Sequence, residues 1–177
     1  MHRLFVAIRP PAPIREQLLD LMEGVNGASW QDEDQLHLTL RFVGEVERHV
    51  ADDIAAELAT VRHPGFELRL NGIGSFERRG QAVTLWAGVL PHGPLKALHR
   101  KVDQAVQRAG VEPDHRAYLP HISLARLGRA AGPIATLLAA HGGVSSPPFR
   151  VDSFRLYESR LSPQGALYSV VERYRLD

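Results

Sequence analysis

The segment Leu36-His37-Leu38-Thr39-Leu40-Arg41-Phe42-Val43-Gly44 recurs in altered form as Pro120-His121-Ile122-Ser123-Leu124-Ala125-Arg126-Leu127-Gly128. Both copies share the order histidine, aliphatic, hydroxyl, leucine, two variable residues, aliphatic and glycine. The alternation of apolar and polar residues predicts a β-strand in each copy, and residues i and i+2 of a strand share a face. We therefore expect each histidine and its hydroxyl to point one way, and the aliphatic residues to pack on helices.

Strand-like and helix-like patterns are mixed along the rest of the chain without strict alternation. Strands are predicted at Leu4–Ile8, Leu36–Val43, Phe66–Leu70, Ala82–Val89, His121–Leu127, Phe149–Leu156 and Tyr168–Leu176. Helices are predicted at Pro13–Val25, Val46–Val61, Pro94–Ala109 and Pro133–Ala140. Turn residues at Glu77–Gly80 and Ser162–Gly165 predict two hairpins, and Asn71–Gly74 predicts a bulge or turn. This mixture predicts an α+β fold with mainly antiparallel sheets.

No Ser- or Gly-rich linker divides the chain, so residues 1–177 are predicted to form a single domain. Each half contains a His-strand, then a helix, then a hairpin. This repetition indicates two pseudo-symmetric lobes related by a pseudo-two-fold axis, with helices on the outside. Both His-hydroxyl pairs would then line one central cleft.

Bulk composition excludes several classes of protein. Hydrophobic residues make up 44% and charged residues 23%, which is typical of a globular chain and not of a disordered one. The net charge of +1 provides no overall basic field, although Arg78-Arg79 and the stretch 115–126 are locally basic. The absence of cysteine excludes disulfides, thiol nucleophiles and Cys-ligated zinc. No segment resembles a signal peptide or a membrane span, so we expect a cytoplasmic monomer.

Two histidines facing one cleft suit phosphodiester chemistry. Because an imidazole has an ordinary pKa of roughly 6.5, one ring can remove a proton from water while the other protonates a leaving oxygen. Thr39 and Ser123 can donate to non-bridging phosphate oxygens, and a nearby arginine can hold the charge. No metal or cofactor is needed for such a reaction, and neither histidine has the spacing of a metal ligand.

Other polar residues carry weaker signals. A bare His-x-Ser/Thr pair also occurs by chance, so the prediction depends on the shared strand context and flanking residues. None of the other seven histidines has this pattern; His49 and His99 fall on predicted helices and are expected to be solvated, as is the loop 32–34. No dinucleotide, P-loop or Gly-x-Ser-x-Gly motif is present.

With these motifs and their flanks, the sequence resembles the 2H phosphoesterase superfamily, which is named for two His-x-Thr/Ser motifs. Within it, the chain is similar to the RNA 2′,3′-cyclic phosphodiesterases, also called 2′-5′ RNA ligases. The similarity covers nearly the whole chain. Besides both motifs, it includes Arg3–Ile8, Asn71–Phe76, Leu85–Val89 and Leu156–Ser159. The second motif carries Ser123 where the family more often has threonine, but the hydroxyl is retained.

The resemblance implies a bilobal α+β fold and hydrolysis of a terminal RNA 2′,3′-cyclic phosphate to a 2′-phosphate. It assigns His37 as the acid that protonates the leaving 3′ oxygen and His121 as the base that activates water, although a near-symmetric pair permits the reverse. Thr39 and Ser123 would bind the phosphate oxygens. Arg126 would support the same charge, or else be an ordinary surface arginine.

Two alternatives remain open from the sequence. The same groove could catalyse the reverse reaction, in which RNA ends such as tRNA halves are joined through a 2′-5′ linkage. A non-catalytic RNA-end binder is the other, although binding alone does not require an acid and a base. Four aromatic residues are candidates for stacking on a terminal base: Phe5, Phe42, Phe76 and Tyr118.

Overall fold

The sheet and helices of the computed structural model, which describes residues 1–177, follow the predicted patterns closely. The strands are β1 (His2–Ile8), β2 (Ala28–Trp30), β3 (Leu38–Val46), β4 (Phe66–Arg78), β5 (Gln81–Leu90), β6 (Ile122–Leu127), β7 (Phe149–Val151), β8 (Ser153–Ser162) and β9 (Gly165–Arg175). The helices are α1 (Ala12–Leu19), α2 (Arg48–Leu58), α3 (His92–Arg108) and α4 (Ala135–His141), with a short 3₁₀ helix, η1, at Glu33–Gln35. Every strand pairing is antiparallel, which confirms the predicted α+β class.

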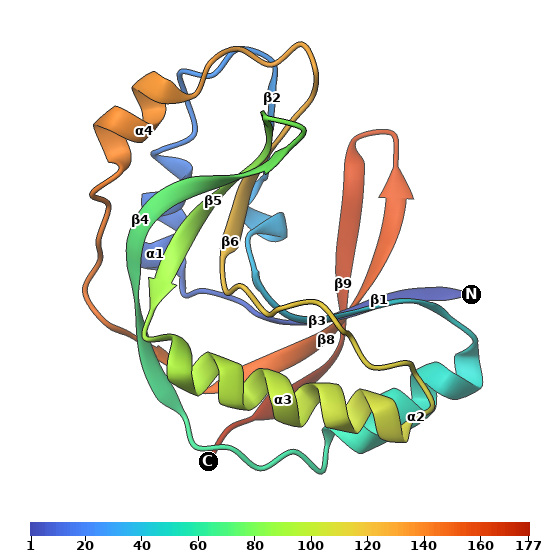
Figure 1. Cartoon of the computed structure of the whole chain (residues 1–177). Coiled ribbons are helices and arrows are strands. Elements are labelled where there is room, and N and C mark those ends of the chain that lie inside the picture. Colours follow the sequence, from blue (N-terminus) through green and yellow to red (C-terminus); the bar gives the residue numbers. More distant parts are fainter.

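One curled sheet runs through the molecule in the order β7-β4-β5-β6-β3-β1-β8-β9, with β2 also paired to β6. The two His-strands, β3 and β6, are neighbours at its centre, where Leu38 pairs with Ile122. On each side of this centre comes a flanking strand, β5 or β1, and then a hairpin strand, β4 or β8. In Figure 1, β4, β5 and β6 rise on one side of β1 and β3, and the β8–β9 hairpin rises on the other.

The chain crosses the centre of the sheet after each His-strand. The β4–β5 hairpin follows β3 in sequence but joins the sheet next to β6. The β8–β9 hairpin follows β6 but joins the sheet next to β1. Each half of the sequence therefore supplies strands to both sides of the molecule, and the two histidines are held by a shared framework. None of the helices is long and apolar enough to span a membrane.

The main core lies between the sheet and the helices. It contains 34 buried residues, among them Leu38 and Leu40 of β3 and Ile122 and Leu124 of β6. The predicted apolar face of α3 is buried in it, and α3 packs against β3 and α2. A second, smaller cluster of Phe5, Ala7 and Tyr157, with Tyr168 packed against it, is separate from this core. The sheet thus carries a separate aromatic cluster around β1, and Phe5 of this cluster contacts His37.

Several predicted boundaries were wrong for identifiable reasons. The first helix ends at Leu19 and not Val25, because the apolar residues Leu21 and Val25 are buried from an irregular segment that turns at Gly24 (φ +81°). The single strand predicted at 149–156 is divided into β7 and β8, which pair with different strands, β4 and β1.

The predicted loop at 32–34 overlaps η1. Asp32 caps it by accepting a hydrogen bond from the Gln35 amide, while the Gln35 side chain accepts one from the Asp32 amide. The acidic side chains around it are solvent-exposed, as predicted. The strand β2 was missed because three residues give too short a pattern to recognise.

Both predicted hairpins are confirmed. The tip of the first has positive φ at Arg79 (+54°) and Gly80 (+78°), the conformation that two-residue hairpin turns require. Asn71–Gly74 forms a bulge inside β4, with a register shift and with Gly72 at φ +74°. The two motif glycines are less alike than the sequence suggests, because only Gly44, at φ +91°, adopts a left-handed conformation.

Candidate active site

Both motif histidines occupy the position immediately before their strands. The His37 Nδ1 atom lies 2.7 Å from the carbonyl oxygen of Gln35, and the His121 Nδ1 atom lies 2.6 Å from that of Leu119. Since a carbonyl oxygen can only accept, each Nδ1 carries the proton of this bond. The Nε2 atoms are therefore left to take up or release protons, and they are equivalent in the two motifs.

The central strand pairing brings the two motifs together. Because β3 and β6 run antiparallel and Leu38 pairs with Ile122, Thr39 lies across from His121, and His37 lies across from Ser123. Leu38 and Ile122 are buried in the core, so these four polar residues occupy the opposite face. The Leu38–Ile122 pairing thus brings a histidine next to the hydroxyl residue of the other motif on each side of that pair.

Burial controls the protonation of both rings. Desolvation lowers the pKa of His37 and of His121 below the ordinary value, and the backbone carbonyl at Nδ1 opposes it in each case. The charge of His121 lowers the pKa of His37 further, so the two rings are close enough to interact. In the free protein both imidazoles are therefore biased towards the neutral form, and a bound anion would shift them towards the charged form.

Each motif histidine packs against its own set of aromatic rings. The His37 ring centroid lies 4.9 Å from that of Phe5 and 5.5 Å from that of Tyr168, which approaches edge-on at 84°. The His121 ring centroid lies 4.8 Å from that of Phe76, also edge-on at 87°. These contacts restrict the orientation of both imidazoles and exclude water from their flanks.

Trp86 completes the surroundings of His121. Its ring centroid lies 6.5 Å from that of His121, and the Trp86 backbone pairs with Ser123. The indole covers Gly74, where a Cβ atom would come within 2.6 Å of it. A glycine is therefore required at this position of β4.

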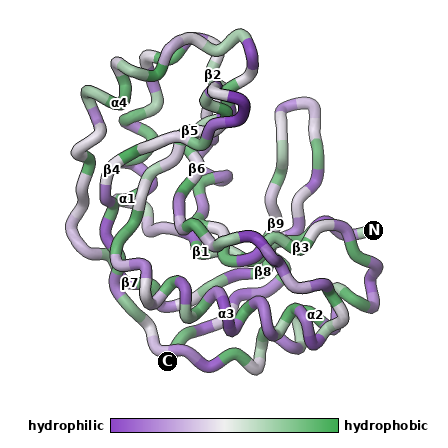
Figure 2. Tube along the Cα trace, viewed as in Figure 1, coloured by the Kyte–Doolittle hydropathy of each residue, from purple (hydrophilic) through white to green (hydrophobic).

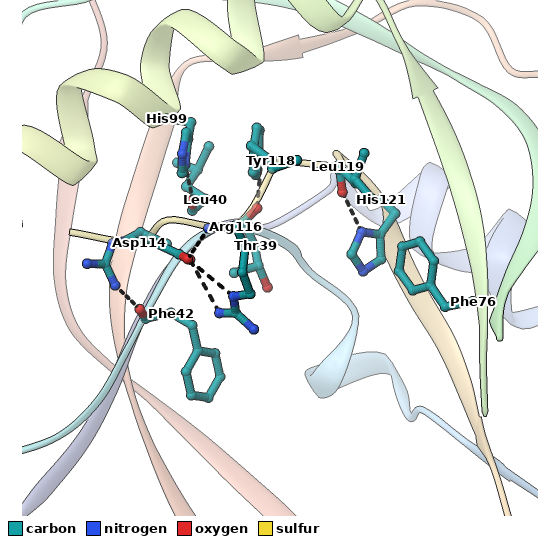
Figure 3. Close-up of a pocket in the computed structure, with 12 residues that line it drawn as sticks. Thr39, Leu40, Phe42, Phe76, His99, Asp114, Arg116, Tyr118, Leu119 and His121 are labelled. Atoms are coloured by element: carbon teal, nitrogen blue, oxygen red, sulfur yellow. Dashed lines mark hydrogen bonds and ion pairs between the residues drawn. The ribbon is translucent and has the colours of Figure 1, made fainter. Parts of the chain in front are cut away.

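A cavity of about 240 Å³ opens beside Thr39 and His121. In Figure 3, His121 and Phe76 lie together on one side, with Thr39 and Arg116 opposite them and Phe42 beyond Arg116. The Arg116 Nε atom donates to Asp114 at 3.2 Å, and the arginine remains largely exposed. The cavity thus combines the second-motif histidine with two phenyl rings and a cationic side chain.

His99 was predicted to be solvated, and this prediction was wrong. Its ring stacks on Tyr118 with centroids 4.2 Å apart, and its Nδ1 atom lies 2.6 Å from the carbonyl oxygen of Leu40. The Tyr118 hydroxyl donates to the carbonyl oxygen of Thr39 at 2.8 Å. Helix α3 and the segment before β6 therefore hold the β3 backbone at Thr39 and Leu40. His49, in contrast, is exposed as predicted.

Arg41 is a buried charge that the sequence interpretation missed. Only 5% of its side chain is exposed, and its Nε atom donates to Asp103 of α3 at 2.7 Å. Its other nitrogens donate to the carbonyl oxygens of Phe42 and Glu112. A charged residue between the apolar residues Leu40 and Phe42 of the strand was the signal available in the sequence. Arg41 ties β3 to α3 and to the segment that leads to Arg116.

Arg126 lies away from the cavity of Thr39 and His121. It is exposed on β6 and lines a second cavity of about 320 Å³ together with Gln31, Gln164 and Tyr168. Its charge lowers the pKa of Tyr168, although burial raises that pKa by more. Because Tyr168 also contacts His37, Arg126 belongs to the His37 side of the site. Tyr168 itself was not recognised as a candidate from the sequence.

Comparisons with known proteins find relatives over most of the chain. The family model of the 2′-5′ RNA ligase superfamily matches residues 10–162. A protein of Aeropyrum pernix named RNA 2′,3′-cyclic phosphodiesterase is 33% identical over 143 residues, which cover 79% of this chain and 81% of that protein. The Escherichia coli protein of the same name is 30% identical over 190 residues, covering 99% and 97%.

Similarity also extends to three-dimensional structure. The apo crystal structure of E. coli LigT matches with a TM-score of 0.80 at 29% identity, covering 99% of this chain and 97% of that one. The matched family region contains both His-hydroxyl motifs and the strands that carry them. On these grounds the chain belongs to the 2′-5′ RNA ligase superfamily.

Proposed function

We propose that this protein hydrolyses a terminal RNA 2′,3′-cyclic phosphate to a 2′-phosphomonoester by metal-independent acid–base catalysis. The observation that carries the proposal is the pairing of Leu38 with Ile122 at the centre of the sheet, which brings the two His-hydroxyl motifs together. The curated relatives named RNA 2′,3′-cyclic phosphodiesterase support the same activity.

In the proposed reaction, the Nε2 atom of His121 takes a proton from water as the water oxygen attacks phosphorus. The bond from phosphorus to the 3′ oxygen breaks, and that oxygen receives the proton from Nε2 of His37. His37 ends neutral and His121 ends protonated, and exchange with solvent restores both. The assignment of acid and base follows the family resemblance, and the hydrogen-bonded Nδ1 atoms support the use of Nε2 in both steps.

Binding of the anionic substrate favours the protonated form of His37, which is the form that acts as the acid. Burial lowers the pKa of His37, so an imidazolium is disfavoured in the free protein at neutral pH. A phosphate placed between the rings raises the pKa of both, because the opposite charge favours the protonated form. In this proposal the hydroxyls of Thr39 and Ser123 donate to the non-bridging oxygens, which carry the negative charge in the transition state.

RNA rather than a free nucleotide is the proposed substrate, and an arginine patch supports it. Arg78 and Arg79 at the tip of the β4–β5 hairpin and Arg129 after β6 line one cavity, and none of them forms an ion pair within the chain. Figure 2 shows this hairpin tip as strongly hydrophilic. These free cationic side chains, at the end of β6 away from His121, can bind the phosphates of the RNA upstream of its terminus.

The test uses a short RNA ending in 2′,3′-cyclic phosphate, incubated with the protein in EDTA and followed by phosphorus NMR. We expect complete conversion to the 2′-phosphomonoester and a value of kcat/KM that falls as salt is raised. A cyclic mononucleotide should be hydrolysed with little salt dependence, because it does not reach the arginine patch. Formation of the 3′-phosphate, full dependence on added metal, or binding without turnover would each contradict the proposal.

Reversible 2′-5′ joining of RNA ends is a second candidate. It is favoured by the two cavities, one beside His121 and one on the His37 side, because an incoming 5′-hydroxyl end needs space that water does not. The two candidates share one site and differ in the nucleophile. Addition of an RNA with a 5′-hydroxyl to the same reaction distinguishes them, since joining gives a longer product resistant to enzymes specific for 3′-5′ linkages.

A further inference from the structure

Tyr168 reaches the site from the far edge of the sheet. It lies on β9, in the hairpin that rises opposite β4, β5 and β6 (Figure 1). Its ring meets His37 edge-on, with the centroids 5.5 Å apart, and packs on Phe5 at 4.9 Å. The Gln35 side chain donates to the carbonyl oxygen of Ala166 at 2.9 Å and so fixes the hairpin against the segment that carries His37.

The Tyr168 hydroxyl differs from those of two other tyrosines. Tyr118 and Tyr174 each donate to a backbone carbonyl, whereas the hydroxyls of Tyr157 and Tyr168 make no hydrogen bond within the chain. Of these two, only Tyr168 lines a cavity of the site. Tyr168 lines the same cavity as Arg126, and the charge of Arg126 acts on its hydroxyl. Burial raises the pKa of Tyr168, so the group stays protonated and remains a donor at neutral pH.

We infer that Tyr168 is a substrate-binding residue whose hydroxyl donates to a non-bridging oxygen of the phosphate, alongside Arg126. The inference rests on the proposed function, because it requires a phosphate between His37 and His121. It gives the His37 side of the phosphate a donor in addition to Ser123, from a hydroxyl that lines the cavity shared with Arg126. The ring itself restricts the His37 imidazole in both the free and the bound protein.

The test compares Tyr168→Phe with Tyr157→Phe. The first variant keeps the ring that packs on His37 and removes only the hydroxyl. The second removes a hydroxyl from the same aromatic cluster, where Tyr157 stacks on Phe5 with centroids 5.1 Å apart and does not line the cavity. Calorimetry with inorganic phosphate measures affinity without turnover, and steady-state kinetics on the cyclic mononucleotide separates kcat from KM.

For Tyr168→Phe we expect the Kd for phosphate to rise about tenfold or more, as for the loss of a hydrogen bond to a charged acceptor. kcat/KM should fall by a similar factor, the pH profile should keep its shape, and Tyr157→Phe should behave as the unaltered protein. Phosphate affinity in Tyr168→Phe equal to that of the unaltered protein would overturn the inference, even if hydrolysis by the unaltered protein upheld the proposed function. A failure of the unaltered protein to hydrolyse cyclic phosphate would instead reject the proposed function.

Discussion

Replacement of His37 or His121 by alanine is expected to lower kcat/KM for the cyclic phosphate by about 10²–10⁴-fold, the usual contribution of a positioned general acid or base. Each variant leaves the donors Thr39 and Ser123 in place, so substrate should still bind while proton transfer is lost. Stopped assays on the cyclic mononucleotide, at several pH values, measure the effect. In each variant, the profile of kcat/KM against pH should lose the limb that depends on the removed imidazole.

His49→Ala is the matched control, because this ring is exposed on α2 and makes no contact with the cleft. Its activity should equal that of the unaltered protein, and circular dichroism should show all three variants folded. The double variant should lose little more than the single ones, since two groups that act in one step are not additive. Near-normal turnover by both single variants would reject the two-histidine assignment.

Removal of the partner of the buried Arg41 should have the largest effect on stability. Asp103→Leu leaves the guanidinium with only carbonyl acceptors, and breaking a buried ion pair in this way costs about 3 kcal/mol or more. For a chain of this length, that corresponds to a drop in Tm of roughly 6–12 °C. Thermal unfolding followed by circular dichroism measures the change.

Two further variants separate burial from charge. Arg41→Met combined with Asp103→Leu should recover part of the lost stability, because removing both charges is less harmful than leaving one unpaired. Arg108→Ala breaks an exposed pair with Glu57 and should cost no more than about 1 kcal/mol. An Asp103→Leu protein as stable as Arg108→Ala would show that the Arg41 pair does not hold β3 to α3.

Local features of the fold could be predicted because they depend on neighbours in sequence. The strands that follow His37 and His121, the turn at Arg79-Gly80 and the apolar face of α3 each arise from a pattern within a short window. The predicted apolar face of each His-strand is buried for the same reason, since it follows from the period of a strand.

The sheet order and the outer parts of the site could not be obtained in this way. Nothing local indicates that β4–β5 joins β6, or that β8–β9 joins β1 and brings Tyr168 to His37. Arg41 and His99 look like surface residues by type, and only their partners on distant elements explain their burial. The features that could not be predicted are therefore those that depend on contacts between residues far apart in the sequence.

The central claim is that both imidazoles act on one phosphate, and a pH titration of the His37 and His121 ring resonances by NMR tests it most directly. In the free protein both pKa values should lie below 6.5, because both rings are desolvated. Saturation with inorganic phosphate should raise both, because the anion stabilises each imidazolium. A rise at only one ring, or at neither, would contradict the account, since the two histidines would then not share a substrate.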